Sequence, residues 1–467
     1  MSKNEKLKEL KEKLFIQQKN AFSKEYDISS ADELCEEYKR FLNIGKTERL
    51  CVKESVRLAE KFGFVPFERG MSLKPGDKIY RNNRGKALVL AVIGSDGIER
   101  GSNIAAAHID SPRIDLKQSP LYESEGFCLF KTHYYGGIKK YQWPTIPLEL
   151  HGVVVLKNGE TVEVSIGNDV SDPVFVITDL LPHLGKDQLK KTAAEIFTGE
   201  NLNILCGSKP CEGAEDSAQD AVKLNVLKLL NDKYGITEED FLSAELCAVP
   251  AFPARDLGLD RSMIGAYGHD DRVCAFPSLY AILTADSPKK TSVCILADKE
   301  EIGSEGVSGM QSMFFETFME DICESQNARL RVCFENSVCL SADVTVAMDP
   351  NFSEVSEKNN SAYLNRGIAL CKFTGARGKS GSNDASAELV GRVRRLFDDN
   401  NVLWQMGELG KVDQGGGGTV AMYMAKRNIE TIDAGVPVLS MHSPFETVAK
   451  ADVYMCYKAI RVFFENN

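Results

Sequence analysis

The amino-acid sequence predicts an α/β fold with a mixed central sheet, helices on both faces of that sheet, and an inserted β-rich domain. Three observations support this prediction. Apolar segments of strand length recur along the chain, segments with helical periodicity lie between them, and the middle of the chain holds a series of strand-like segments. Because 467 residues exceed the usual size of a single core, we expect two domains.

The main domain is predicted from the order of its apolar and amphipathic segments. Residues 29–63 have the pattern of helices, whereas "KALVLAVIG" (86–94) and "NIAAAHID" (103–110) have the pattern of buried strands that end in polar residues. The same strand pattern returns at 292–298, 337–343 and 436–442. Further helices are predicted at 271–285, 310–327, 384–399 and 419–428.

The middle of the chain differs from this alternation. It contains the strand-like segments "GFCLFKTHYYGGIKKYQW", "LELHGVVVLKNGETVEVSIGN" and "PVFVITDLL", with a Lys-Asn-Gly-Glu turn inside the second, and then a helical, acidic stretch at 212–233. We therefore predict an inserted β-rich domain at 119–247. The main domain is then discontinuous and consists of 1–118 and 248–467.

Composition and charge exclude several classes of partner. The net charge of -11 argues against nucleic acid or an anionic membrane as a partner. The basic N-terminal segment has apolar residues at helical spacing, so it is neither a signal peptide nor a membrane span, and no other apolar run has the length of a membrane span. The thirteen cysteines are scattered and many lie inside apolar runs, as expected for buried thiols in a reducing compartment. We expect a cytoplasmic protein.

Polar residues that bind metals follow several of the predicted strands. They are His108 and Asp110 in "AAAHID", Asp270 and Asp271 in "GHDDR", Glu300 and Glu301 in "ADKEEIG", Asp343 in "LSADVTVAMDPN" and His442 in "LSMHSPFE". Taken singly, each has an ordinary structural explanation, such as a helix N-cap for an aspartate. Strand ends of an open α/β sheet share one edge, however, so these residues are expected to converge there.

The residue types suit a pair of divalent ions. Two histidines and three carboxylates form a nitrogen and oxygen ligand set that fits zinc, manganese or cobalt. One carboxylate bridges two metals through its two oxygens, and the repulsion between Glu300 and Glu301 is relieved by the positive charge. The pattern therefore indicates a dinuclear metal site.

The order "HID…GHDDR…DKEEIGSEG…SADVTVAMDPN…MHSPFE" resembles the aspartyl-aminopeptidase-type family of dinuclear zinc metallopeptidases. The resemblance extends from about residue 17 to the C-terminus and includes "YYGGIKKYQW" and "QGGGGTVA". It implies the fold of the zinc exopeptidases and two zinc ions per subunit. The ligand sets that it implies are His108, Asp270 and Asp343 for one metal, and Asp270, Glu301 and His442 for the other.

The resemblance also implies roles for neighbouring residues. Glu300 matches the general base, and Asp110 matches the carboxylate that orients His108. Asp271 is left out of the ligand set, because a carboxylate at the beginning of a helix is explained by the helix dipole.

The implied activity is hydrolysis of the first peptide bond of short peptides with a free N-terminus. Lys372 matches the position of a lysine that binds acidic first residues in the family, but "ARGKSGSND" lacks the family's Arg-Tyr pair, so a strict acidic preference is not implied. His183 in "DLLPHLGKD" lies where a family histidine reaches a neighbouring subunit, although the second histidine of that region is absent. The alternative explanation is a solvated strand-edge position for Lys372 and a core or loop position for His183. The family assembles into homo-oligomers, typically dodecamers, through the inserted domain.

Two other functions stay open at this point. One is a metal-dependent amidase or deacylase that acts on a non-peptide amide, and the other is a catalytically silent assembly protein. The glycine-rich "DQGGGGTVA" (413–421) lacks the Gly-Lys-Ser/Thr ending of a phosphate-binding loop. Its glycines are better explained by a turn or by close approach of the backbone to the metal edge.

Overall fold

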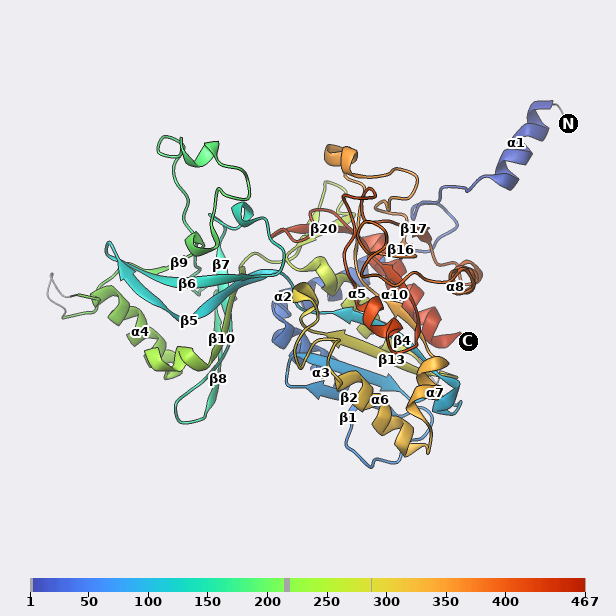
Figure 1. Ribbon diagram of the computed structural model, residues 1–467, viewed down its shortest axis with the longest axis horizontal. Coiled ribbons are helices and arrows are strands. Elements are labelled where there is room, and N and C mark those ends of the chain that lie inside the picture. Colours follow the sequence, from blue (N-terminus) through green and yellow to red (C-terminus); the bar gives the residue numbers. More distant parts are fainter. Residues whose placement is uncertain (1–2, 214–218, 287, 467) are drawn as a thin grey trace.

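The computed structural model describes residues 3–213, 219–286 and 288–466, which form two lobes (Figure 1). The larger lobe contains a nine-stranded sheet with helices, and the smaller lobe contains a six-stranded sheet. Helix α1 (Lys3–Leu14) projects from the larger lobe and has no buried residue (Figure 1). No helix among the described residues is both long enough and apolar enough to span a membrane.

The nine-stranded sheet is mixed, and its centre is parallel. Strands β13, β4, β14 and β18 are parallel neighbours, whereas β3 pairs antiparallel with β13 and β16 pairs antiparallel with β18. In spatial order the strands are β1 (Val65–Pro66), β2 (Lys78–Asn83), β3 (Ala87–Val92), β13 (Thr291–Ala297), β4 (Ser102–His108), β14 (Val338–Ser341), β18 (Glu430–Gly435), β16 (Ile368–Cys371) and β17 (Trp404–Met406).

Both faces of this sheet are covered by helices, and the central strands β13, β4 and β14 are buried at every position. Side chains of one strand alternate between two hydrophobic clusters: Cys294 and Leu296 of β13 face one, and Val293 and Ile295 face the other. The first cluster includes α2 (Ala31–Ile44), α3 (Glu48–Lys61), α5 (His269–Thr284), α8 (Ala387–Asp399) and α10 (Lys450–Glu465). The second includes α6 (Phe314–Ser325), α7 (Leu330–Glu335) and α9 (Val420–Ala425).

The smaller lobe has its own core, built around the antiparallel sheet. Trp143, Phe130 and Phe241 are among the buried residues of that core, which also includes residues of α4 (Ala221–Tyr234). The strands in spatial order are β8 (Thr161–Ile166), β7 (Leu148–Val155), β10 (Ala244–Pro250), β5 (Arg113–Ser124), β6 (Phe127–Tyr135) and β9 (Ile204–Gly207).

The predicted fold class is confirmed: the structure is α/β, with a mixed central sheet, helices on both faces and a second, β-rich lobe. The six-stranded sheet extends slightly beyond the predicted insert of 119–247, since β5 begins at Arg113 and β10 ends at Pro250. Residues 214–218 of the predicted insert and helical stretch lie outside the described residues. The domain limits stay a prediction.

The strand predicted at 436–442 is mostly wrong. Only β19 (Pro437–Val438) forms there, and it pairs with β15 (Thr345–Val346) outside the central sheet. The backbone φ is positive at Ser440 (58°) and at His442 (63°), so the chain turns where the apolar pattern predicts extension. After the turn, β20 (Glu446–Ala449) joins β12 (Met263–Ala266) and β11 (Arg255–Leu257) in a three-stranded sheet.

Candidate metal centre

The candidate metal centre lies at the edge of the central sheet where the parallel strands β13, β4 and β14 end. His108 is the last residue of β4, Glu300 and Glu301 follow β13, and Asp343 follows β14. Asp270 comes from the first turn of α5. The convergence follows from the parallel pairing, because the carboxyl ends of parallel neighbours lie side by side.

The start of α5 is held against the end of β4 by a buried arginine. Arg272 is 1% exposed and donates hydrogen bonds to the carbonyls of Ile109 (3.3 Å) and Lys46 (3.2 Å). Gly268, just before the helix, has φ +76°, and a Cβ there would lie 1.9 Å from Nη1 of Arg272. Glycine at 268 therefore permits the close approach that places Asp270 beside His108.

Asp270 lies between the two histidines. Its Oδ1 is 3.1 Å from Nε2 of His108, and its Oδ2 is 3.1 Å from Nε2 of His442. Burial would raise the pKa of Asp270, but the hydrogen bonds with the two histidines hold this pKa well below its ordinary value. One carboxylate with one oxygen directed to each histidine has the arrangement of a bridging metal ligand.

The two glutamates occupy a single turn of 3-10 helix, Glu300–Ile302. Lys299 before it and Gly303 after it both have positive φ, so the chain reverses tightly on either side. Oε2 of Glu301 lies 3.5 Å from Nε2 of His442, and Oε2 of Glu300 lies 4.0 Å from Nε2 of His108. Burial raises the pKa of Glu300 to about 7 and raises the pKa of Glu301 well above its ordinary value.

Asp110 connects the glutamate turn to His108. Its Oδ1 accepts the N–H of Glu300 (3.2 Å) and its Oδ2 accepts that of Glu301 (3.3 Å). Nδ1 of His108 lies 3.0 Å from the carbonyl oxygen of Asp110 and 3.3 Å from Oδ1. The hydroxyl of Tyr135, at the end of β6, donates to Oδ2 (2.8 Å). Asp110 thus has the position predicted for a residue that orients His108, and it orients the glutamates as well.

His442 is oriented by the smaller lobe. Its Nδ1 is 2.7 Å from the carbonyl oxygen of Gly137, which follows β6, so Nε2 is directed toward Asp270 and Glu301. A Cβ at Gly137 would lie 3.4 Å from that Nδ1. Although burial lowers the pKa of His442, the hydrogen bond with Asp270 and the charge of Glu301 raise it to about 10.

Asp343 lies near a residue that the predicted ligand sets omit. Ligand atoms of His108, Asp271 and Asp343 lie within 4.8 Å of one another, as do those of His108, Asp270 and Glu301. Oδ2 of Asp271 accepts the backbone N–H of His108 (3.2 Å), and its Oδ1 has no hydrogen-bond partner among the described residues. In the sequence, the only indication that Asp271 lies at the site is its position next to Asp270 in "GHDDR".

The donor set fits divalent cations. Burial, together with neighbouring carboxylates, raises the pKa of Glu301 and of Asp343 well above the ordinary value. Oε1 of Glu301 is buried and lacks a hydrogen-bond partner among the described residues. Carboxylates that repel one another in a buried position, with imidazole nitrogens among them, form the kind of site that zinc neutralises.

Another residue that the sequence analysis missed is Glu446, the first residue of β20. It is 1% exposed, and its carboxylate accepts the backbone N–H of His442 (2.7 Å) and of Asp270 (3.0 Å). Burial and the charge of Asp270 raise the pKa of Glu446 to about 8. Glu446 ends the segment "MHSPFE" that contributes to the family resemblance, but the residue types alone do not indicate which backbone groups it contacts.

The predicted substrate-binding residues lie elsewhere. Among the described residues, no hydrogen bond or ion pair joins Lys372 or His183 to the metal-centre cluster. Since β16 is antiparallel to β18 and Cys371 pairs with Asp433, Lys372 follows the end of β16 that points toward the beginning of β18, away from His108. Nζ of Lys372 is 3.3 Å from Oδ1 of Asp384. His183 is exposed in a loop of the smaller lobe.

The glycine-rich segment lies against the chain that follows Lys372. The N–H of Gly417 donates to the carbonyl of Thr374 (2.8 Å), and a Cβ at Gly416 would lie 2.5 Å from Cα of Ala376. The glycines therefore permit close backbone approach, as predicted, but to the segment after β16.

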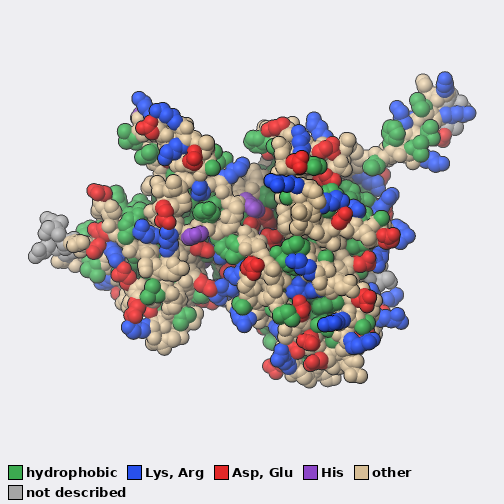
Figure 2. Space-filling view, viewed as in Figure 1, with side chains coloured by type: hydrophobic (Ala, Val, Ile, Leu, Met, Phe, Trp, Pro, Cys, Tyr) green, Lys and Arg blue, Asp and Glu red, His purple; other side chains and the backbone are tan. Residues whose placement is uncertain are grey.

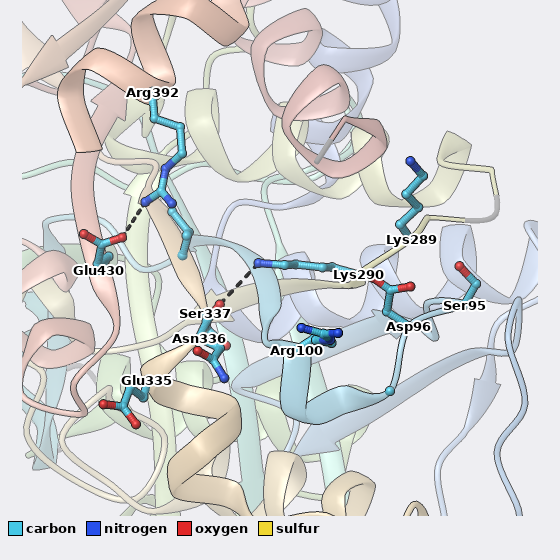
Figure 3. Close-up of a pocket in the computed structure, with 12 residues that line it drawn as sticks. Ser95, Asp96, Arg100, Lys289, Lys290, Glu335, Asn336, Ser337, Arg392 and Glu430 are labelled. Carbon is cyan, nitrogen blue, oxygen red and sulfur yellow. Dashed lines mark hydrogen bonds and ion pairs between the residues drawn. The ribbon is translucent and has the colours of Figure 1, made fainter. Parts of the chain in front are cut away.

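A cavity of about 790 Å³ lies at the opposite end of the central sheet, where β14 and β18 begin (Figure 3). Its lining mixes charges of both signs, including Lys290, Arg392 and Glu430, and includes no residue of the metal-centre cluster. Figure 2 shows histidine side chains at the surface near the junction of the two lobes, with acidic and basic groups intermixed over the rest of this face.

Comparisons with known proteins agree with this geometry. The family described as aminopeptidase I zinc metalloprotease (M18) matches residues 41–464. The probable M18 family aminopeptidase 1 of Clostridium acetobutylicum is 49% identical over 464 residues, which cover 97% of this chain and 99% of that protein. The crystal structure of an M18 family aminopeptidase from Thermotoga maritima has a TM-score of 0.93 and 46% identity, and the match covers 97% of this chain and 100% of that chain.

A more distant structure shares the fold. The mApe1 dodecamer of S. cerevesiae has a TM-score of 0.76 at 22% identity, with 93% of this chain and 97% of that chain covered. The resemblance drawn from the sequence motifs is confirmed by the family match, and the activity agrees with it: the chain belongs to the M18 family and is a zinc aminopeptidase.

Proposed function

We propose that this aminopeptidase uses two zinc ions to remove the N-terminal residue of short peptides. The observation that carries the proposal is the carboxylate of Asp270, which directs one oxygen to His108 and the other to His442, 3.1 Å from each. In this proposal His108, Asp270 and Asp343 would hold one ion, and Asp270, Glu301 and His442 would hold the other. Zinc bound by these residues would supply Lewis-acid chemistry, which lowers the pKa of a water molecule and polarises a carbonyl group.

Glu300 is proposed as the general base. Its side chain is 18% exposed, compared with 4% for Glu301, so Glu300 lies at the border between the cluster and solvent. A carboxylate in that position takes a proton from water and returns it to the leaving amine. Asp110 holds the backbone of Glu300, and it fixes the tautomer and orientation of His108.

We propose that acidic first residues are accepted without strict preference. Lys372 and Lys379 both pair with Asp384, at 3.3 Å and 3.0 Å, so much of their positive charge is already compensated. A free ammonium would favour an Asp or Glu side chain more strongly than a paired one does.

We also propose that the protein acts as a homo-oligomer, with a dodecamer as the expected form, in the cytoplasm. Near His183 in the sequence, the smaller lobe has exposed apolar side chains at Val170, Leu180, Leu181, Leu184 and Leu189. Exposed apolar side chains of this kind favour contact with another copy, which would bring His183 toward a neighbouring active site. None of the thirteen cysteines forms a disulfide, which suits a reducing compartment.

The experiment combines metal analysis with a panel of aminoacyl anilides. After a chelator has removed metal and zinc has been restored, we expect two zinc ions per chain and recovered hydrolysis of anilides with a free α-amine. N-acetylated anilides are expected to resist hydrolysis. Full activity without metal, or a single zinc ion at full activity, contradicts the dinuclear proposal. The panel also measures the preference for acidic first residues, and sedimentation measures whether the particle mass is about twelve times the 51.6 kDa of one chain.

A further inference from the structure

Glu446 connects two residues of the candidate metal centre that come from distant parts of the chain. Its Oε2 accepts the N–H of Asp270, 176 positions away, at 3.0 Å, and its Oε1 accepts the N–H of His442 at 2.7 Å. The carboxylate is thus used on both oxygens, one for each backbone donor.

Both donors need this acceptor. The N–H of Asp270 lies at the start of α5, where Asp270 and Asp271 have non-helical backbone angles and the first N–H groups have no acceptor within the helix. The N–H of His442 lies in a turn where the residue has φ 63°. Because Glu446 is 1% exposed, water does not readily replace it as the acceptor.

The same two residues also meet through their side chains, since Oδ2 of Asp270 lies 3.1 Å from Nε2 of His442. Glu446 therefore holds the backbones of Asp270 and His442, and so affects the distance between their side chains. Its own backbone is anchored by the pairing of β20 with β12, in which Glu446 lies opposite Ala266.

We propose that Glu446 is a positioning residue that sets the separation of Asp270 and His442 and thereby the zinc affinity of the centre, an inference that rests on the proposed function. Glutamine at 446 offers one acceptor oxygen and an NH₂ group that faces a backbone donor, so at least one hydrogen bond is lost. Aspartate keeps the charge but is one methylene shorter, so it does not span both donors.

Asp452 provides a matched control. This residue of α10 is also fully buried, and its two oxygens accept the N–H groups of Asn365 and Gly367, each at 2.7 Å. Asp452→Asn therefore damages the same kind of contact outside the metal centre. A purely structural role for Glu446 predicts the same behaviour for variants at both positions.

The experiment measures zinc affinity of the metal-free full-length protein by competition with a chromophoric chelator, and stability by urea unfolding. We expect Glu446→Gln and Glu446→Asp to lower zinc affinity by about 10- to 100-fold. Asp452→Asn is expected to keep the affinity within about twofold while losing stability.

The other possible results refute either the positioning role of Glu446 or the proposed function. If the Glu446 variants lose stability but bind zinc as the wild type does, or if Asp452→Asn loses as much affinity, the positioning role is refuted. If Glu446→Gln does not fold, Glu446→Asp supplies the measurement. Failure of the wild type itself to bind zinc instead refutes the proposed function, which separates the two results.

Discussion

The hydroxyl of Tyr135 donates a hydrogen bond of 2.8 Å to Oδ2 of Asp110 and so joins the two sheets at the candidate metal centre. Tyr135 is the last residue of β6 in the smaller lobe, and Asp110 follows β4 of the central sheet. Because Asp110 also holds the backbone of Glu300 and Glu301, the smaller lobe contacts the proposed base through one buried carboxylate.

Tyr135→Phe removes this donor and little else. We expect the free energy of unfolding to fall by about 1–3 kcal/mol, since a hydrogen bond to a buried charged group is lost. Turnover is expected to fall by about 10-fold, because the carboxylate that orients His108 and the glutamate turn is held less firmly. Steady-state kinetics on an aminoacyl anilide and urea unfolding measure the two effects.

Tyr234→Phe is the control for this variant. In the wild type, the hydroxyl of Tyr234 donates to the carbonyl of Ser165 (2.9 Å) in the same lobe, at a position outside the metal-centre cluster. Stability is expected to fall slightly and turnover to stay unchanged. Equal loss of turnover in both variants would show that the lobe affects activity only through its overall stability.

Gly435→Ala tests the close approach of β18 to Asp343. A Cβ at Gly435 would lie 1.8 Å from the backbone oxygen of Asp343, so one of the two backbones must move. We expect the free energy of unfolding to fall by about 3 kcal/mol or more. Zinc per chain, measured by elemental analysis, is expected to fall as well, because Asp343 is displaced.

Gly391→Ala is the contrasting substitution. Gly391 lies inside α8, and a Cβ there would have no neighbour within 4 Å. Alanine has the higher helix propensity, so stability is expected to rise by about 0.4–1 kcal/mol without change in zinc content. A Gly435→Ala variant that matches Gly391→Ala in stability and zinc content contradicts the packing argument.

The adjacent glutamates are expected to respond differently to the same change. Glu300→Gln keeps the ligand set and removes the proposed base, so zinc content is retained while turnover falls by about 10²–10⁴-fold. Glu301→Gln replaces a charged ligand and is expected to lose zinc as well as activity. Each variant is measured for zinc per chain and for anilide hydrolysis. Retention of zinc and full activity by both would overturn the role assignment.

The sequence could predict the part of the site that follows from parallel strands. His108, Glu300 and Asp343 end apolar segments, and parallel pairing is sufficient to bring such ends together. Glu446 and Gly137 could not be predicted, because they act on His442 through backbone groups whose positions depend on the tertiary fold.

The direction of a strand relative to its neighbours is a second feature that the sequence could not predict. An apolar run such as that before Lys372 predicts a buried strand but not whether it runs parallel or antiparallel to its neighbours. In the structure β16 is antiparallel to β18, which directs Lys372 away from His108. The turn at His442 could not be predicted either, because the apolar pattern there is typical of a strand. In the structure, the positive φ of Ser440 and His442 interrupts it.

Asp452 provides a prediction about the dependence of stability on pH. Burial raises its pKa to about 7, although it accepts the N–H groups of Asn365 and Gly367. The ordinary pKa of an aspartate is 3.8, so between about pH 4 and pH 7 the unfolded chain has released this proton while the folded chain retains it. The contribution of Asp452 to stability is therefore greatest below about pH 4, falls as pH rises, and levels off above about pH 7.

Asp452→Asn removes this titration. The rise of the Asp452 pKa from 3.8 to about 7 corresponds to about 4 kcal/mol, so the stability difference between variant and wild type is expected to move in favour of the variant by up to that amount from pH 4 to pH 7. Urea unfolding of both proteins at several pH values measures this difference, and using the difference cancels the titration of groups that the two proteins share. A difference that stays constant with pH would mean that Asp452 ionises in the folded protein as readily as in the unfolded chain, and that its two backbone hydrogen bonds fully compensate for its burial.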